Sequence, residues 1–238
     1  AVVGGGLMGS GLAQEFATAG YDVNLQDIDD GQLKAAIERI RENLAMLAAH
    51  GLVEAASIEA IVGRVTCTLA LADAVSAADL VIEAAVETVE IKQGLFRSLS
   101  ELCPAHAILA STTSAIHPDI LAEATDCPDR VIVAHFGFPN YLLPLVEMAR
   151  AAKTSDETAT TVYALLENMG KRPIIMKKPL QGFIVNRLQM ALMREALNIV
   201  SQGAARPEDI DIAVQNSFGR RYAVSGPLAV FDMTGLIV

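Results

Sequence analysis

The sequence has few cysteines and histidines, and neither residue type is grouped. Its three cysteines, Cys67, Cys103 and Cys127, are far apart and form no Cys-x-x-Cys pair, which argues against a disulfide framework and a thiolate metal site. The four histidines show no metal-ligand spacing, so we expect no metal. Unpaired cysteines fit a reducing compartment, and we expect a cytoplasmic protein.

Positive charge and long apolar runs are also scarce. Lysine and arginine number 18 against 28 acidic residues, giving a net charge of −10. Phosphate backbones and anionic lipids repel such a protein, so neither nucleic acid nor a membrane is an expected partner. No apolar run approaches the roughly 20 residues that cross a bilayer, and the N-terminus shows no signal-peptide pattern. With 238 residues, 52% of them apolar, the chain has enough material for a large globular core in one or two domains.

A glycine-rich turn opens the chain, between a strand-like stub and a helix-like segment. It contains Gly4-x-Gly6-x-x-Gly9, with Leu7 and Met8 between the last two glycines. Gly4 permits the tight turn, Gly6 lets backbone approach a pyrophosphate, and Gly9 lets the helix pack against the strand. The helix N-terminus then offers N–H groups and a partial positive charge to phosphates, so the turn predicts a dinucleotide site.

An acidic residue strengthens this prediction. Asp27 ends the second predicted strand, 18 residues after Gly9, where a carboxylate accepts the ribose hydroxyls of a dinucleotide. An acid at this place repels a 2′-phosphate, so the expected cofactor is NAD rather than NADP.

The first 180 residues alternate strand-like and helix-like segments. The predicted strands are apolar on both faces and rich in valine and isoleucine, as in a parallel sheet covered by helices. They span residues 1–4, 22–27, 65–69, 80–84, 107–111, 131–136 and 173–177. Amphipathic helices are predicted over 29–50, 87–102 and 155–169, the last with Ser155 as N-cap and Gly170 at its C-terminal end. The fold class is therefore α/β, a Rossmann-type doubly wound and mostly parallel sheet.

The pattern becomes all-helical after Pro179. A long helix is predicted over 183–200 and another from Pro207, so we expect a nucleotide domain over 1–180 and the start of a helical domain over 181–238. We expect this second domain to be incomplete, because residues 235–238 close it with neither a helix nor a charged tail, and a few residues to be missing before Ala1. The helix over 183–200 is apolar nearly all round, which predicts burial, partly against a second subunit.

A histidine and a glutamate form the candidate catalytic pair. His135 ends the predicted strand 131–136, at the edge of the sheet where doubly wound folds place their sites, and Glu147 follows 12 residues later. A carboxylate that holds the imidazole tautomer makes a workable acid/base unit. A buried histidine with a satisfied hydrogen bond and a glutamate on a helix face would give the same spacing.

Other polar residues interrupt apolar segments. Ser114 closes the Ser-Thr-Thr-Ser segment after another predicted strand, where its hydroxyl reaches the sheet edge or caps a turn. Asn186 lies in the apolar start of the long helix, so it faces a cleft or an interface. Glu87 and Lys92 lie at the start of a predicted helix, where acids are also ordinary decoration.

These segments together resemble the 3-hydroxyacyl-CoA dehydrogenase family, and more closely its short-chain, 3-hydroxybutyryl-CoA dehydrogenase-like members. The resemblance covers essentially the whole chain and is carried by residues 4–9, 87–92, 111–114, 135–147, 182–187 and 219–227.

The resemblance implies oxidation of a 3-hydroxyacyl-CoA by NAD, a place in fatty acid metabolism and a homodimer. His135 is then the base for the hydroxyl and Glu147 its partner. Ser114 and Asn186 hold the reacting oxygen, while Glu87 and Lys92 line the nicotinamide side of the cofactor site.

Two departures from the family pattern leave other substrates open. Phe138 stands where the family has asparagine, so an amide is missing unless Asn140 replaces it. The predicted helix end 46–51 carries His50 but no lysine for a CoA phosphate. The segment 139–147 also resembles the lambda-crystallin and carnitine dehydrogenase branch, which oxidises free hydroxy acids, and Arg220 or Arg221 could bind a substrate carboxylate there. A non-catalytic NAD-binding protein is the third interpretation. Acyl length, stereochemistry and direction stay open.

Overall fold

The computed structural model describes residues 1–233 and 235, and the chain folds into two compact units, 1–183 and 184–238. The predicted closing segment 235–238 therefore lies outside the described residues apart from Gly235. Among the described helices, none is long and apolar enough to cross a membrane.

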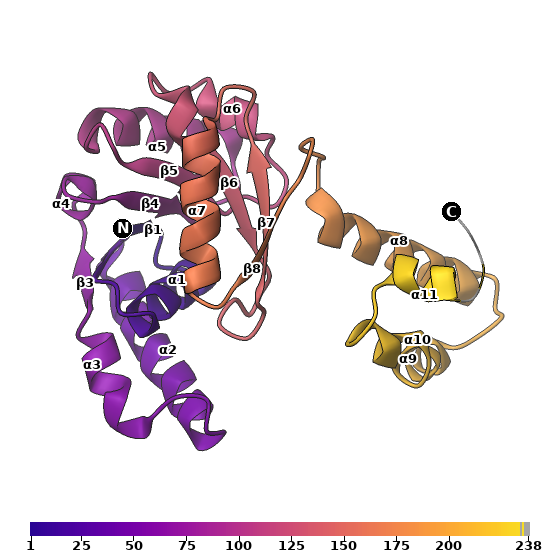
Figure 1. Cartoon of the computed structure of the whole chain (residues 1–238). Coiled ribbons are helices and arrows are strands. Elements are labelled where there is room, and N and C mark those ends of the chain that lie inside the picture. Colours follow the sequence, from indigo (N-terminus) through magenta and orange to yellow (C-terminus); the bar gives the residue numbers. More distant parts are fainter. Residues whose placement is uncertain (234, 236–238) are drawn as a thin grey trace. The chain divides into compact units, whose positions relative to one another are not determined.

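An eight-stranded sheet forms the centre of the first unit (Figure 1). Its strands lie in the order β3-β2-β1-β4-β5-β6-β7-β8, and all neighbours are parallel except β6 and β7. The strands are β1 (Val2–Val3), β2 (Val23–Gln26), β3 (Val65–Thr68), β4 (Leu80–Glu83), β5 (Ile108–Ser111), β6 (Val131–Phe136), β7 (Leu145–Arg150) and β8 (Arg172–Ile175). The order 3-2-1-4-5-6 is that of a Rossmann-type sheet, which confirms the predicted fold class.

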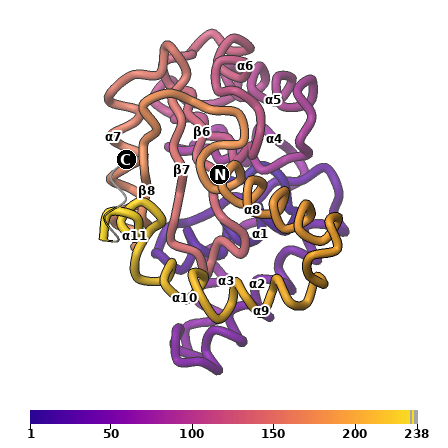
Figure 2. The backbone as a smooth tube through the Cα atoms, turned by 90° about the vertical axis from the view of Figure 1, so that its right-hand side faces the viewer, coloured from indigo at the N-terminus to yellow at the C-terminus, as the bar shows by residue number. Residues whose placement is uncertain are grey.

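Helices cover both faces of this sheet, and successive strand residues alternate between the two apolar layers. One layer, which takes Ile132, is completed by α1 (Leu7–Thr18), α2 (Asp30–Ala49), α3 (Ile58–Val62) and α7 (Asp156–Asn168). The other, which takes Val133, is completed by α4 (Leu71–Val75), α5 (Val89–Leu102) and α6 (Pro118–Ala122). Figure 2 shows α5 and α6 side by side, and short 3₁₀ turns lie at Ala55–Ser57 and Pro128–Arg130.

Local signals set the ends of several helices. Ser155 accepts a hydrogen bond from the Thr158 N–H at the start of α7, and Gly170 follows its end with a φ of 79°. Both predicted helix ends are therefore confirmed. The strand β7 was not predicted, because its apolar residues follow a proline and the segment carries Glu147 at a buried position.

The second unit is helical. It continues α8 (Phe183–Ser201), whose first residue belongs to the first unit, and adds α9 (Pro207–Gln215), α10 (Phe218–Tyr222) and α11 (Pro227–Met233). In this chain the apolar stripe of α8 is open: Leu188, Met193 and Leu197 are 56%, 54% and 64% exposed. The chain alone does not bury the helix as expected, and burial against a second subunit stays a prediction.

Candidate active site

The glycine turn between β1 and α1 is shaped for a ligand backbone. Gly4 has a φ of 107°, which favours glycine, and a Cβ on Gly9 would lie 1.7 Å from the Gly4 carbonyl oxygen. A Cβ on Gly6 would meet no atom within 4 Å. Backbone conformation and close packing thus require Gly4 and Gly9, whereas Gly6 borders open space.

The N-terminus of α1 faces that space without a side-chain cap. Gly6 is the N-cap residue and supplies no capping side chain, so the first-turn N–H groups of Leu7 and Met8 are available to an anion. A dinucleotide pyrophosphate fits this cradle, because it presents negative charge and needs close backbone approach.

Asp27 lies directly after β2 and is bound to the same turn. Its Oδ2 accepts a hydrogen bond of 2.6 Å from the Gly5 N–H, and its Oδ1 accepts one of 3.1 Å from the Asp29 N–H. Each carboxylate oxygen keeps acceptor capacity for a ribose hydroxyl. The turn and this carboxylate together fit the adenosine half of NAD.

His135 and Glu147 are direct cross-strand neighbours in the antiparallel pair of β6 and β7. The Nδ1 of His135 lies 2.9 Å from Oε2 of Glu147, and both side chains are buried, at 10% and 2% exposed. A carboxylate accepts a proton-bearing nitrogen, so Nδ1–H donates to Glu147 and Nε2 keeps the lone pair. The alternative of a glutamate on a helix face was wrong, because Glu147 lies on a strand.

Ser114 meets the other nitrogen of this imidazole. Its Oγ lies 3.3 Å from His135 Nε2, and the residue itself is exposed, so a substrate oxygen has access to both groups. The loop after β5 that carries Ser114 is fixed by Glu87, which accepts hydrogen bonds from the Ser114 N–H at 3.0 Å and from the Thr113 hydroxyl. Burial raises the pKa of Glu87, but these hydrogen bonds and the charge of Lys92 act together more strongly, so its pKa lies below the ordinary value.

Lys92 lies beneath the site. It is 1% exposed, and its Nζ lies 2.6 and 2.8 Å from the two carboxylate oxygens of Glu83, a residue with no exposed surface at the end of β4. The same ammonium lies 3.3 Å from Oε2 of Glu87. Lys92 therefore supports Glu87 from inside the protein, and a direct contact with the cofactor stays a prediction.

Comparisons with known proteins show the family to which the chain belongs. The family model for the 3-hydroxyacyl-CoA dehydrogenase NAD binding domain matches residues 1–179, and that for the C-terminal domain matches residues 182–238. The chain belongs to the 3-hydroxyacyl-CoA dehydrogenase family.

Similar proteins within the family carry different names. The probable 3-hydroxybutyryl-CoA dehydrogenase of Bacillus subtilis is 37% identical over 235 residues, which cover 99% of this chain and 80% of the relative. The L-carnitine dehydrogenase of Oceanobacillus iheyensis is 33% identical, with 99% and 75% covered. The solved structure of 5-formyl-3-hydroxy-2-methylpyridine 4-carboxylic acid 5-dehydrogenase, described as an NAD+-dependent dismutase, has a TM-score of 0.91 and 35% identity, with 99% and 75% covered. The chain is thus an oxidoreductase of this family, and its cofactor is NAD.

The structure places a further residue at the candidate site, one that the sequence did not indicate. The ring of Phe183 packs against the imidazole of His135, with centroids 5.1 Å apart and planes inclined by 39°. Phe183 is 2% exposed and has a φ of 50°, an unusual conformation for a bulky residue. Nδ1, Nε2 and one ring face of His135 thus each meet a defined neighbour. Asn186 lies further along α8 in the second unit, and its contact with the reacting oxygen stays a prediction.

The segment between β6 and β7 is held in place by Lys171. Lys171 donates to the carbonyl oxygens of Asn140 at 2.6 Å and Leu143 at 3.1 Å, and forms a buried ion pair with Glu15 of α1. The side chain of Asn140 has no exposed surface and packs on α1, where a Cβ on Gly11 would lie 2.1 Å from its Oδ1. Asn140 therefore does not replace the family's missing amide.

Phe138, which stands in the place of that amide, is 55% exposed. Its ring carries no hydrogen-bonding group, and its expected role in filling space near the nicotinamide or substrate stays a prediction.

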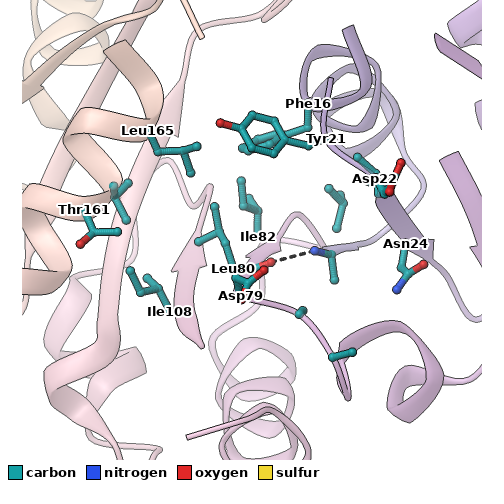
Figure 3. A pocket seen from close by; sticks show the side chains of 16 residues that line it. Phe16, Tyr21, Asp22, Asn24, Asp79, Leu80, Ile82, Ile108, Thr161 and Leu165 are labelled. Atoms are coloured by element: carbon teal, nitrogen blue, oxygen red, sulfur yellow. Dashed lines mark hydrogen bonds between the residues drawn. The ribbon is translucent and has the colours of Figure 1, made fainter. Parts of the chain in front are cut away.

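A cavity of about 590 Å³ lies at the opposite edge of the sheet, where the parallel strands begin. Figure 3 shows Leu165 of α7 and Phe16 of α1 over Leu80 and Ile82 of β4, with a dashed line for the 2.7 Å hydrogen bond from the Ala1 amino group to the Leu80 carbonyl. This cavity is separate from the candidate active site, which lies where the same strands end. Among the described residues, no group of three side chains suitable for a metal ion occurs.

Proposed function

We propose that this protein oxidises a 3-hydroxyacyl-CoA to the 3-oxoacyl-CoA with NAD. The observation that carries the proposal is His135, whose Nδ1 is bound to buried Glu147 and whose Nε2 faces the accessible Ser114 hydroxyl. This imidazole lies at the carboxyl edge of the parallel strands, the edge that also carries the glycine turn. A base and a dinucleotide cradle at one edge are the two parts that alcohol oxidation needs.

Each polar side chain of the site has a separate role in the proposed reaction. Nε2 of His135 accepts the proton of the 3-hydroxyl, and Glu147 stabilises the imidazolium that forms. The Ser114 hydroxyl donates to the substrate oxygen while charge develops there, and Asn186 is proposed as the second donor. When bound, NAD supplies the acceptor for the hydride that leaves C3. The hydroxyl oxygen thus loses a proton, C3 loses a hydride, and a carbonyl remains.

Two observations support a CoA thioester as the substrate. Both family models describe 3-hydroxyacyl-CoA dehydrogenases, and a similar relative carries the name of a 3-hydroxybutyryl-CoA dehydrogenase. Ser114 is also exposed, and its N–H is bound to Glu87, so the site is accessible to a substrate from solvent.

A free hydroxy acid of the lambda-crystallin or carnitine dehydrogenase type is the second candidate. The end of α2 carries no lysine for a CoA phosphate, and His50 there is bound through Nδ1 to the Met46 carbonyl at 2.9 Å. Arg220 and Arg221 on α10 are then the proposed partners of a substrate carboxylate. The name of the carnitine-oxidising relative is consistent with this candidate.

The test measures NAD reduction with a panel of 3-hydroxyacyl-CoAs and the matching free 3-hydroxy acids. We expect kcat/KM to be higher for the CoA esters by at least tenfold. Preference for a free acid supports the second candidate. No reduction with any substrate, together with normal NAD binding, identifies a non-catalytic NAD-binding protein.

A further inference from the structure

An arginine outside the catalytic group contacts the glycine turn. Arg39 lies in the middle of α2, and its Nη2 donates to the Gly5 carbonyl at 2.6 Å. Its Nε donates to the Ser10 hydroxyl in the first turns of α1 at 3.3 Å. We infer that Arg39 is a cofactor-affinity residue, which fixes the glycine turn and supplies the positive charge that the pyrophosphate of NAD neutralises.

The first part of the inference rests on the two sides of Gly5. Its N–H donates to Asp27, and its carbonyl accepts from Arg39. Glycine gives a chain little conformational preference of its own, so hydrogen bonds from outside must define the turn. Asp27 and Arg39 thus fix Gly5, the residue before Gly6 and the uncapped N-terminus of α1. The N–H groups that meet the phosphates are thereby held in place before the cofactor arrives.

The second part rests on the charge of Arg39. Within the described part of the chain, this half-buried guanidinium contacts neutral oxygens but no carboxylate. Arg41, two residues later on the same helix, is instead paired with Glu38 and Glu59. A partly buried cation without a counter-ion is costly, and an anion nearby relieves that cost. The neighbouring α1 N-terminus is the place where a diphosphate is expected.

The position of Arg39 and its charge serve the same purpose, which is to bind an anionic cofactor at the turn. The protein carries a net charge of −10, which opposes the approach of an anionic cofactor. The positive charge of Arg39 offsets this repulsion beside the glycine turn. The hydrogen bonds of Arg39 to Gly5 and Ser10 hold the guanidinium at that position. Nearby Asp27 recognises the ribose, so Asp27 and Arg39 are assigned to different parts of the dinucleotide.

The experiment compares Arg39→Gln with Arg41→Gln, a matched control on the same helix. Calorimetry measures the Kd of NAD and of ADP-ribose for the full chain without substrate, at low and high salt. Competition against NAD measures the affinity of adenosine, which keeps the ribose and lacks phosphate. Because substrate is absent, the result is independent of the proposed reaction.

We expect Arg39→Gln to weaken NAD and ADP-ribose by roughly tenfold or more at low salt, to reduce the salt dependence, and to change adenosine by less than twofold. Arg39→Lys should recover part of the loss because it restores the charge, and Arg41→Gln should bind NAD as the parent does. Unchanged NAD affinity in Arg39→Gln overturns the inference. Equal losses for NAD and adenosine also overturn it, since they indicate a general disturbance of the turn rather than phosphate recognition.

Discussion

Replacing Lys92 by methionine should strongly destabilise the first unit. The substitution keeps an unbranched side chain, one atom shorter, and removes its charge, which leaves the carboxylate of Glu83 buried without a counter-ion. Glu83 has no exposed surface, and Lys92 is 1% exposed, so water reaches neither group. The Ser111 hydroxyl and the Ala85 N–H still donate to Glu83, at 2.6 and 2.7 Å, but neither carries a charge.

Breaking a buried ion pair by removing one partner costs about 3–5 kcal/mol. That is a large share of the roughly 5–15 kcal/mol by which a domain is stable, and it corresponds to a fall in Tm of about 6–20 °C for a unit of this size. Denaturant unfolding followed by circular dichroism measures the free energy of unfolding directly.

Two further variants make the result specific. The double variant Glu83→Gln with Lys92→Met removes the unpaired charge and should recover at least half of the loss. Lys34→Met breaks the exposed pair of Lys34 with Asp30, whose side chains are 77% and 58% exposed, and should leave the free energy of unfolding close to that of the parent. If Lys92→Met lies within about 1 kcal/mol of the parent, the reasoning about this buried pair is refuted.

Three further predictions concern affinity, turnover and pH. Asp27→Ala should weaken NAD and narrow the preference for NAD over NADP, measured as the ratio of the two Kd values; an unchanged ratio contradicts the ribose assignment. Phe183→Leu should lower kcat by roughly 10- to 100-fold by loosening the imidazole of His135, while Phe183→Tyr retains most activity; equal kcat in Phe183→Leu excludes the positioning role. Burial raises the pKa of Glu15 from 4.5 to about 7, against the opposing effect of its lysine partner, so the folded protein binds this proton more tightly than the unfolded chain does. Stability should therefore fall by about 3 kcal/mol as pH rises from 4.5 to 7, and Glu15→Gln should flatten that fall in unfolding curves taken across this range; an identical slope in both proteins contradicts the assignment.

The parts of the fold that could be predicted rest on local patterns. The glycine turn, the strand before Asp27 and the helix that Ser155 begins each depend on residues within a short stretch of chain. Glycine spacing, apolar strands and capping side chains leave direct marks in a sequence. These marks located the Rossmann-type sheet and the start of the helical segment.

The partner of His135 was harder to assign from sequence. The position of His135 at the end of a strand could be predicted, but the strand that carries Glu147 could not. That strand, β7, runs antiparallel to β6, whereas the other neighbouring strands of this sheet are parallel. The spacing of 12 residues fits several structures. Only pairing across the sheet places the two side chains together.

The buried ion pair of Lys92 with Glu83 was also not predicted from the sequence. On α5, Ile91 is 46% exposed, while Lys92, Phe96 and Leu99 form the buried stripe. A charged residue in a buried position is recognisable only through its counter-ion. That counter-ion, Glu83, comes from a different element, as does Glu15, the counter-ion of Lys171.

The central claim is that His135 is the base in an NAD-dependent oxidation of a 3-hydroxyacyl-CoA. The most direct measurement is the rate of NADH formation from 3-hydroxybutyryl-CoA at saturating NAD, in the parent and in His135→Gln, with the Kd of NAD measured for both. The account predicts rapid NADH formation by the parent, a loss of roughly 10²–10⁴-fold in the variant, and equal NAD affinity. Comparable rates of NADH formation in the two proteins would contradict it.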